Sequence, residues 1–378
     1  MKPIINLSLI IALLSTLFSC RGDIYIQLSE STNVQPPKVS SVAGFYLLNE
    51  GNMGSNKATL DYFDETAGVY HSNIYAETNP SAIKELGDVG NDLEIYGSRL
   101  YAVINCSHKV EVMNASDATR IAQVDIPNCR YAIGHGRHLY VSSYVAPAQI
   151  DPHAPRGAVY KVDTLTLDIV DIVEVGYQPE EMAIANGRLY VANSGGYRKP
   201  NYDTTVSVIN LSDFTIENSI EVAINLHRVK ADSHGRIFVS SRGDNNATPS
   251  RLFVIDSTLG IVTNEIDIPV SDLWIKGDSA YIYSVATNEM SGKSTITYGI
   301  LDLNILELVN DNIITDGTDV NIKKPTGIAV HPLTGDIYIA DGRNYVSSGR
   351  LHCYSSDGTL KWSQTTGEIP AHFAFLIK

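Results

Sequence analysis

The chain has 378 residues, of which 44% are hydrophobic and 19% are charged, a balance typical of a globular protein and not of a disordered chain. Its formal net charge of −14 argues against binding to nucleic acid, which requires clustered lysine and arginine. The length alone would allow two or three domains, but β architectures often reach this size as a single unit.

Residues 1–19 have the pattern of an export signal. Lys2 precedes an apolar run that extends from Ile4 to Phe18 and is followed by Ser19 and Cys20. A short basic segment before a compact apolar segment marks a signal peptide, and this one is too short to span a membrane comfortably. The cysteine at the cut resembles a bacterial lipobox, which implies cleavage before Cys20 and lipidation of its thiol. The alternative is an ordinary secretory signal with an incidental cysteine.

Residues 20–40 show little periodicity and contain Ser, Thr, Asn and the pair Pro36-Pro37. We interpret this segment as a flexible, lipid-anchored tether, followed by a globular domain over residues 41–378. Several acyl chains on Cys20 would give a stable membrane anchor.

A four-strand pattern repeats through the globular part. In each repeat a tight turn, such as Asn186-Gly187, joins an apolar first strand to a second strand marked by an aromatic residue. Polarity then rises toward the fourth strand, as expected for a propeller blade that is buried inside and solvated outside. The markers lie 39 to 57 residues apart, which brackets the period of propeller blades. They are Tyr46, Tyr101, Tyr140, Tyr190, Phe238, Tyr281 and Tyr338.

The two ends of the globular part complement each other. Residues 44–49 match a second strand without a first, and residues 369–376 match a first strand with nothing after it. Together they would complete one blade and remove the open sheet edges that promote aggregation. We therefore predict an all-β fold, a seven-bladed β-propeller with four antiparallel strands per blade, in which the C-terminal strand closes the first blade. No helix of ten or more residues is expected.

Long loops between second and third strands are expected to gather on one face of the propeller. Long loops on a rigid scaffold are where binding usually resides. Their amide, tyrosine and arginine side chains suit hydrogen bonding and aromatic contact with a large polar ligand or partner surface better than bond-breaking. The candidate ligand-binding residues are Glu50, Asn52, Asn105, His108, Tyr144, Tyr197, Arg198, Arg242, Asn288, Arg343 and Tyr345.

Catalytic signatures are missing from the sequence, which contains neither a Gly-x-Ser-x-Gly elbow nor a His-Glu-x-x-His motif. We therefore expect no enzyme activity, no catalytic residues, no metal site and no cofactor. A less favoured alternative is a metal-dependent hydrolase of the lactonase type, whose carboxylate–amide site would use Glu50, Glu180 and Asp341.

Three cysteines follow Cys20, so at least one thiol is free. Cys106 and Cys129 flank one repeat and could form a disulfide at one end of a blade, which would leave Cys353 unpaired.

The last repeat carries Pro-x-Gly-Ile-Ala-Val-x-Pro, then Gly-x-x-Tyr-Ile-Ala and Leu-x-x-Tyr, between Pro325 and Tyr354, and it resembles YncE-like propeller repeats. The opening Asn49-Glu50-Gly51-Asn52, the segment Leu86-Gly87-Asp88-Val89 and the closing Ile369-Pro370-Ala371 are similar to surface-layer-type propeller lipoproteins of Bacteroides-like bacteria. The resemblance covers residues 44–378.

That group includes the BtuG-type proteins. The resemblance implies a lipoprotein on the cell-surface side of the outer membrane that captures cobalamin or a related corrinoid and passes it to a TonB-dependent transporter of the BtuB type. It also implies contact with the membrane through the lipid anchor only, and we expect a monomer. The alternative is a propeller scaffold that binds a protein or glycan partner at the cell surface.

Overall fold

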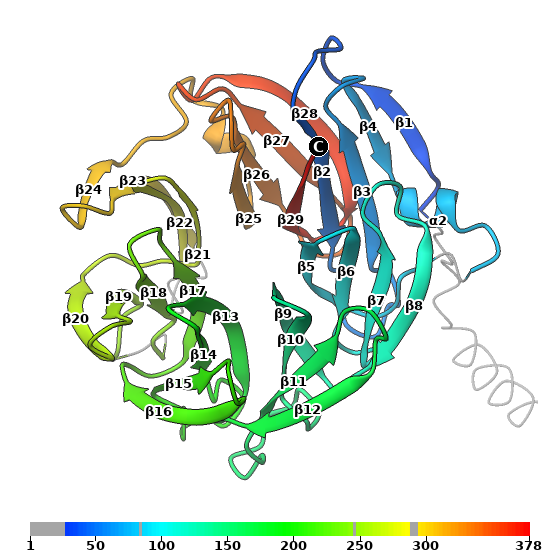
Figure 1. The fold of residues 1–378 in the computed structure, drawn as a ribbon. Helices are drawn as coiled ribbons and strands as arrows, with labels where there is room; N and C mark the ends of the chain where they lie inside the picture. Colours follow the sequence, from blue (N-terminus) through cyan, green and yellow to red (C-terminus); the bar gives the residue numbers. More distant parts are fainter. Residues whose placement is uncertain (1–26, 83–84, 245–246, 288–293) are drawn as a thin grey trace, which may run out of the picture.

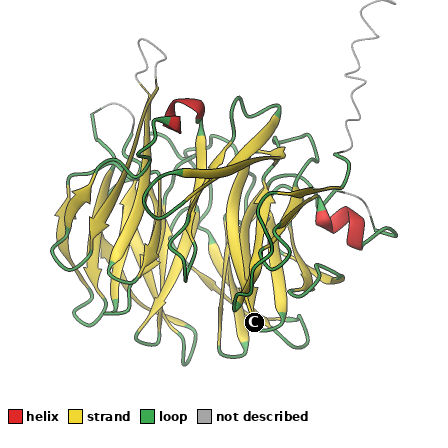
Figure 2. Cartoon of the chain, turned by 90° about the horizontal axis from the view of Figure 1, so that it is seen from above, coloured by secondary structure: helices red, strands yellow, loops and turns green. Residues whose placement is uncertain are grey.

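Seven antiparallel sheets surround a central axis, seen along the axis in Figure 1 and from the side in Figure 2. This computed structural model describes residues 27–82, 85–244, 247–287 and 294–378. Six sheets have four strands each, and the first has a fifth at its outer edge. The predicted all-β, seven-bladed propeller is therefore confirmed.

We number the blades 1 to 7 from the one that contains the first marker, Tyr46. The innermost strands of blades 1 to 7 are β29 (Pro370–Ile377), β5 (Gly90–Tyr96), β9 (Cys129–His135), β13 (Pro179–Ala185), β17 (Leu226–Ala231), β21 (Asp272–Lys276) and β25 (Pro325–Val330). The second strands are β2 (Val42–Asn49), β6 (Arg99–Ile104), β10 (His138–Ser143), β14 (Arg188–Asn193), β18 (Arg236–Ser241), β22 (Ser279–Thr287) and β26 (Ile337–Asp341).

The two outer layers complete each blade. The third strands are β3 (Thr59–Asp64), β7 (Lys109–Asn114), β11 (Ala158–Asp163), β15 (Thr205–Asn210), β19 (Arg251–Asp256), β23 (Ser294–Asp302) and β27 (Ser348–Tyr354). The fourth strands are β4 (Val69–Ser72), β8 (Arg120–Asp125), β12 (Ile169–Glu174), β16 (Thr215–Glu221), β20 (Ile261–Ile266), β24 (Glu307–Asn310) and β28 (Leu360–Glu368).

Burial follows the order of the strands. In blade 3, all but the first residue of β10 are buried, whereas five of the six residues of β12 are exposed. Helix is confined to α2 (Ile74–Thr78) and the 3₁₀ turn η2 (Thr318–Asn321) within the described residues. Neither is long and apolar enough to cross a membrane.

The aromatic markers join neighbouring blades. The hydroxyl of Tyr46 in blade 1 donates to the carbonyl of Ala115 in blade 2 at 3.0 Å, and Tyr190 in blade 4 donates to Ser257 in blade 5 at 3.1 Å. A tyrosine here fills the space between two sheets with its ring and satisfies a buried carbonyl with its hydroxyl. Phe238, which lacks a hydroxyl, keeps the buried ring alone, so ring packing is what the two tyrosines and this marker share.

The ring is closed by the two ends of the chain. β29 is the inner strand of blade 1 and pairs along β2, from Val42 opposite Ile377 to Asn49 opposite Pro370 (Figure 1). The ring of Phe45 on β2 lies 5.7 Å from that of Phe373 and 5.6 Å from that of Phe375, measured between centroids. The predicted closure by the C-terminal strand is confirmed.

One part of the predicted tether is strand. Residues 30–33 form β1 (Glu30–Asn33), which pairs antiparallel with β4 at the outer edge of blade 1. The fourth strand of a blade leaves one row of backbone groups unpaired, and β1 occupies that row. The chain therefore attaches to the propeller before the expected start of the domain at residue 41.

The predicted disulfide between Cys106 and Cys129 is wrong, because both thiols are free. Cys129 is buried where blades 2 and 3 pack, and its thiol donates to the carbonyls of Ile104 and Lys109 at 3.6 and 3.3 Å. Cys106 lies in the loop after β6, where its thiol donates to Asn105 Oδ1 at 3.4 Å. Burial raises the pKa of Cys129 to about 12, so this thiol is unreactive at neutral pH.

Removing residues 370–378 should unfold or aggregate the protein. The truncation deletes the Phe373 and Phe375 contacts and exposes the edge of β2, and we expect a loss of at least about 5 kcal/mol in the free energy of unfolding. Removing residues 27–33 deletes only the exposed strand β1 and should cost about 1 kcal/mol or less. Denaturant unfolding and size-exclusion chromatography compare the two; equal losses would contradict the closing role of β29.

Candidate functional site

A pocket of about 470 Å³ opens on the axis at the face where the inner strands begin. All seven blades line it, which places it at the mouth of the central channel. Its polar and aromatic lining includes Glu50 and His372 of blade 1, Asn91 and Asn105 of blade 2, Arg130 and Tyr131 of blade 3, Tyr197 of blade 4, His227, Arg228 and Arg242 of blade 5, Ser271 and Tyr283 of blade 6, and Thr326 and Tyr345 of blade 7.

β-Bulges turn side chains toward this mouth. Six of the seven inner strands shift register against the second strand at their first residues, and only β21 does not. A bulge adds a residue and redirects side chains locally. In blades 3 and 5, Ser142 and Ser240 accept the backbone N–H groups of Tyr131 and Arg228, at 3.1 and 3.0 Å. These hydroxyls satisfy donors that the interrupted ladder leaves unpaired.

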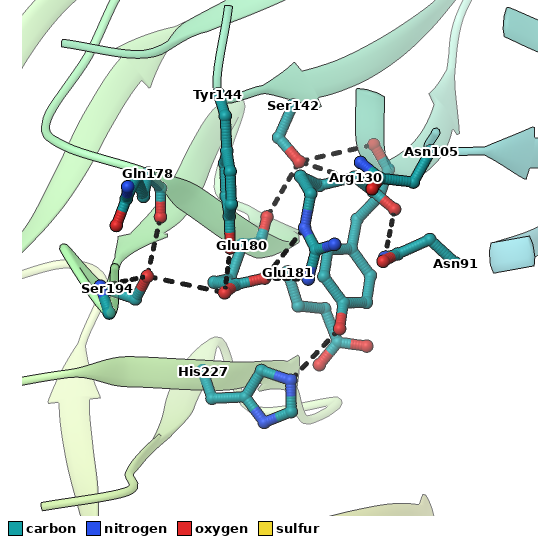
Figure 3. A network of polar contacts seen from close by, with 12 residues as sticks. Asn91, Asn105, Arg130, Ser142, Tyr144, Gln178, Glu180, Glu181, Ser194 and His227 are labelled. Atoms are coloured by element: carbon teal, nitrogen blue, oxygen red, sulfur yellow. Dashed lines mark hydrogen bonds and ion pairs between the residues drawn. The ribbon is translucent and has the colours of Figure 1, made fainter. Parts of the chain in front are cut away.

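Glu180, from the bulge of β13, organises one side of the pocket (Figure 3). Its Oε2 accepts from Nε and Nη2 of Arg130 at 3.3 and 3.0 Å, and its Oε1 accepts from the hydroxyl of Tyr144 at 2.5 Å. Arg242 Nη1 lies 3.5 Å from the same Oε1. Burial alone would raise the pKa of Glu180, but Arg130 and Arg242 more than offset this effect and hold the pKa below its ordinary value.

Tyr131 connects the pocket to blade 5. Its hydroxyl accepts from Arg228 Nη1 at 3.3 Å and lies 3.1 Å from Nε2 of His227. Arg228 is also paired with Asp272 of blade 6, Nε to Oδ1 at 3.0 Å. These contacts connect three blades through side chains that reach toward the axis.

Deeper in the channel, carboxylates bind the backbone of the next blade. Asp92 and Glu94 of β5 accept from the N–H groups of Ala132 and Gly134 of β9, at 2.8 and 3.1 Å. Glu181 of β13 accepts from the N–H of Val229 in β17 at 2.8 Å. Burial raises the pKa of Glu94 from its ordinary 4.5 to about 7.

A comparison with protein families gives one match over most of the chain. The family described as a domain of unknown function, DUF5074, matches residues 43–369. The chain belongs to this family. A comparison with curated proteins finds no matching sequence.

Solved structures resemble this DUF5074 propeller in fold. A periplasmic gluconolactonase from Pseudomonas aeruginosa has a TM-score of 0.58 at 12% identity, over 89% of this chain and 99% of its own. Hydrazine synthase from Kuenenia stuttgartiensis also scores 0.58, at 17% identity over 71% and 77% of the two chains. A quinoprotein alcohol dehydrogenase-like protein from Bacteroides thetaiotaomicron scores 0.56 at 12% identity, over 89% and 79%. At these identities the likeness shows the fold alone.

The structure places five of the eleven candidate binding residues of the DUF5074 propeller in the axial pocket. They are Glu50, Asn105, Tyr197, Arg242 and Tyr345.

Five other candidates lie outside that lining. Asn52 donates to the carbonyl of Tyr345, and His108 Nδ1 accepts the backbone N–H of Asn128 at 2.9 Å. Tyr144 is buried behind the pocket, with the guanidinium of Arg130 4.7 Å from its ring centre. The guanidinium of Arg198 lies 3.5 Å from the ring centre of Tyr177. Arg343 donates to the carbonyl of Ser348 at 3.4 Å. The remaining candidate, Asn288, lies outside the described residues.

The three carboxylates of the lactonase-type alternative are separately occupied. Glu50 pairs with His372 at 3.0 Å, Glu180 is held by the arginines described above, and Asp341 Oδ1 accepts from the N–H groups of Lys324 and Arg343 at 2.8 and 2.9 Å. Among the described residues, no group of three or more His, Cys, Asp or Glu is placed to hold a metal ion. The arrangement thus gives no support to a shared carboxylate site.

The sequence-based prediction concentrated on loops and missed the bulged strand starts. Arg130, Tyr131 and Arg228 were not among its candidates, and Glu180 entered only through the lactonase alternative. A usable pattern was present, because Arg130 and Glu180 each stand ten residues before an aromatic marker, Tyr140 and Tyr190. A polar residue at the same position of several otherwise apolar strands indicates that this position faces the channel.

Glu94→Gln should stabilise the protein in a pH-dependent manner. Because the folded-state pKa is raised to about 7, the wild type loses stability as the pH rises from about 4.5 to 7. The variant lacks this loss. Relative to the wild type, its free energy of unfolding should be higher by ~1–3 kcal/mol above pH 7 and almost unchanged below pH 4. Urea unfolding across this range measures the difference, with Glu221→Gln on the exposed outer strand β16 as control. A gain independent of pH would contradict the assignment.

Proposed function

We propose that this protein is a binding propeller that captures a corrinoid, cobalamin or a relative, at the axial mouth and releases it to a TonB-dependent transporter of the BtuB type. The observation that carries the proposal is the axial pocket, which all seven blades line with tyrosine, amide, arginine and histidine side chains. Such a lining offers many hydrogen bonds from a rigid frame, and rigid, pre-organised sites hold ligands at low entropic cost.

The size and chemistry of the pocket fit part of a corrinoid. A volume of 470 Å³ accepts one edge of so large a molecule, and the remainder would lie over the surrounding loops. The peripheral amides of a corrinoid would pair with side chains such as Asn91 and Arg242, and its ring would contact Tyr197 and Tyr345. The resemblance to BtuG-type lipoproteins supports the choice of ligand and of transporter.

The pocket chemistry also supports binding without bond cleavage. Glu180 is saturated by Arg130, Tyr144 and Arg242, and Glu50 is paired with His372. A carboxylate that acts as a general base must lie within reach of the substrate and be available to take a proton, and these two are occupied. We therefore propose a capture protein and not an enzyme.

A second hollow favours an alternative ligand class, a glycan or protein partner at the cell surface. It measures about 320 Å³ and is lined by Tyr177, Tyr202, Arg156 and Arg198. The guanidinium groups of Arg156 and Arg198 lie 5.5 and 3.5 Å from the ring centre of Tyr177. Aromatic and arginine planes of this kind are common in contact surfaces.

Replacing Tyr345 by alanine should weaken corrinoid binding by ~10–100-fold, because an aromatic side chain at the centre of a binding surface contributes much of its affinity. Calorimetric titration of residues 27–378 with cyanocobalamin and with cobinamide measures the affinity. Tyr96→Ala, at the β5–β6 hairpin on the opposite face, is the matched control and should bind as the wild type does. No heat with either corrinoid would reject the proposed ligand.

We further propose that Cys20 carries the lipid that holds the protein on the outer surface of the outer membrane. Cys20→Ser should move the protein from the membrane fraction to the soluble fraction, because multiple acyl chains give a stable anchor and none remain. Fractionation followed by immunoblotting checks this, with Cys106→Ser as control. Protease accessibility in intact cells then measures surface exposure in a separate experiment. An unchanged membrane fraction for Cys20→Ser would contradict the anchor.

A further inference from the structure

The charges of the axial pocket are unevenly distributed. On the side formed by blades 3 to 5, one carboxylate, Glu180, faces two guanidinium groups, Arg130 and Arg242. This leaves one positive charge in excess. Arg228, in the same region, is matched by Asp272 at 3.0 Å. The carboxylate of the lining itself, Glu50, belongs to blade 1 and pairs with His372 at 3.0 Å.

The two arginines on Glu180 are held differently. Arg130 makes two hydrogen bonds to Oε2 and its side chain is only 14% exposed. Arg242 has a single contact with Oε1, at 3.5 Å from Nη1, and its side chain is 40% exposed. Most of the donors of Arg242 therefore remain available to a ligand, while Glu180, itself held by Arg130, contacts the head group of Arg242.

A neighbouring histidine adds no charge to this side of the pocket. His227 lines the same pocket, and burial together with Arg242, Arg228 and Arg130 holds its pKa well below the ordinary value. The ring is therefore neutral at pH 7, so the excess charge resides on the guanidinium groups. In a protein of formal net charge −14, this is a local positive site inside an acidic molecule.

We propose that Arg242 binds an anionic oxo group of the ligand, such as a phosphodiester, and that Glu180 is the positioning residue for that arginine. The guanidinium fork matches the geometry of phosphate oxygens and binds them with charge-assisted hydrogen bonds. The inference rests on the proposed function for the rest of the ligand, and it orients that ligand with its anionic end toward blades 3 to 5. A cobalamin carries a phosphodiester in its nucleotide loop, whereas cobinamide lacks it.

The first experiment tests the anion site without any corrinoid. Melting temperatures of the wild type, Arg242→Gln and Arg188→Gln are measured in sodium phosphate and in sodium chloride of equal ionic strength. Arg188 is a matched control because it pairs with Glu217 at 2.7 Å, is 34% exposed and begins β14 at the opposite face. Phosphate should raise the melting temperature of the wild type and the control, but not that of Arg242→Gln. An equal response of all three proteins would overturn the proposal.

The second experiment compares the two corrinoids by calorimetry. Arg242→Gln should weaken binding of cyanocobalamin by ~10-fold or more, the usual effect of a lost hydrogen bond to a charged group, and should leave cobinamide within about twofold of the wild type. Arg242→Lys keeps the charge but loses the planar guanidinium fork, so its affinity for cyanocobalamin should lie between those of the wild type and Arg242→Gln. Equal losses for both corrinoids would overturn the role of the anionic group. If neither corrinoid binds the wild type, the proposed function fails, and the phosphate experiment still decides the anion site.

Discussion

The pairing of β29 with β2 is the constraint on which the rest of the structure depends. A blade buries its inner strands only when a neighbour covers each side, so the first and last blades of an open array would both be exposed. By supplying the inner strand of blade 1 from the far end of the chain, the protein gives every blade two neighbours. The axial pocket exists for the same reason, because its lining requires all seven inner strands to begin at a fixed distance from one axis.

Within that ring, six of the seven inner strands shift register where they begin. The hairpins between first and second strands remain regular in blade 2, where Ile95 and Leu100 face each other directly. Register shifts at the other end of the inner strands bring polar side chains to the mouth, and serines such as Ser142 satisfy the backbone groups that are released. The regular end of each inner strand therefore belongs to the frame of the propeller, and its start at the mouth belongs to the binding surface.

The fold was predictable from the sequence because its main determinants repeat. Markers such as Tyr46, Tyr190 and Phe238 each bury an aromatic ring, so the same packing requirement recurs in the chain and becomes visible as a period. The site was less predictable, since each blade contributes a different residue, and Glu180 and Arg130 are 50 residues apart. No local pattern encodes a contact of that kind. The pairing of β1 was also missed, because its exposed residues 30–33 show no apolar alternation and gain their order only from the open edge of β4.

The position of β1 determines how an anchored propeller would stand on a bilayer. Glu30 pairs with Ser72 at the end of β4 nearest the mouth, and the carbonyl of Gln27 accepts from the side chain of Asn73 at 3.0 Å on that same rim. Only six residues lie between Cys20 and Gln27, and the seven steps from one to the other span about 25 Å when fully extended. With a lipid on Cys20, so short a linker attached at the rim of the mouth would hold the open end of the channel over the lipid headgroups and keep the opposite face turned outward.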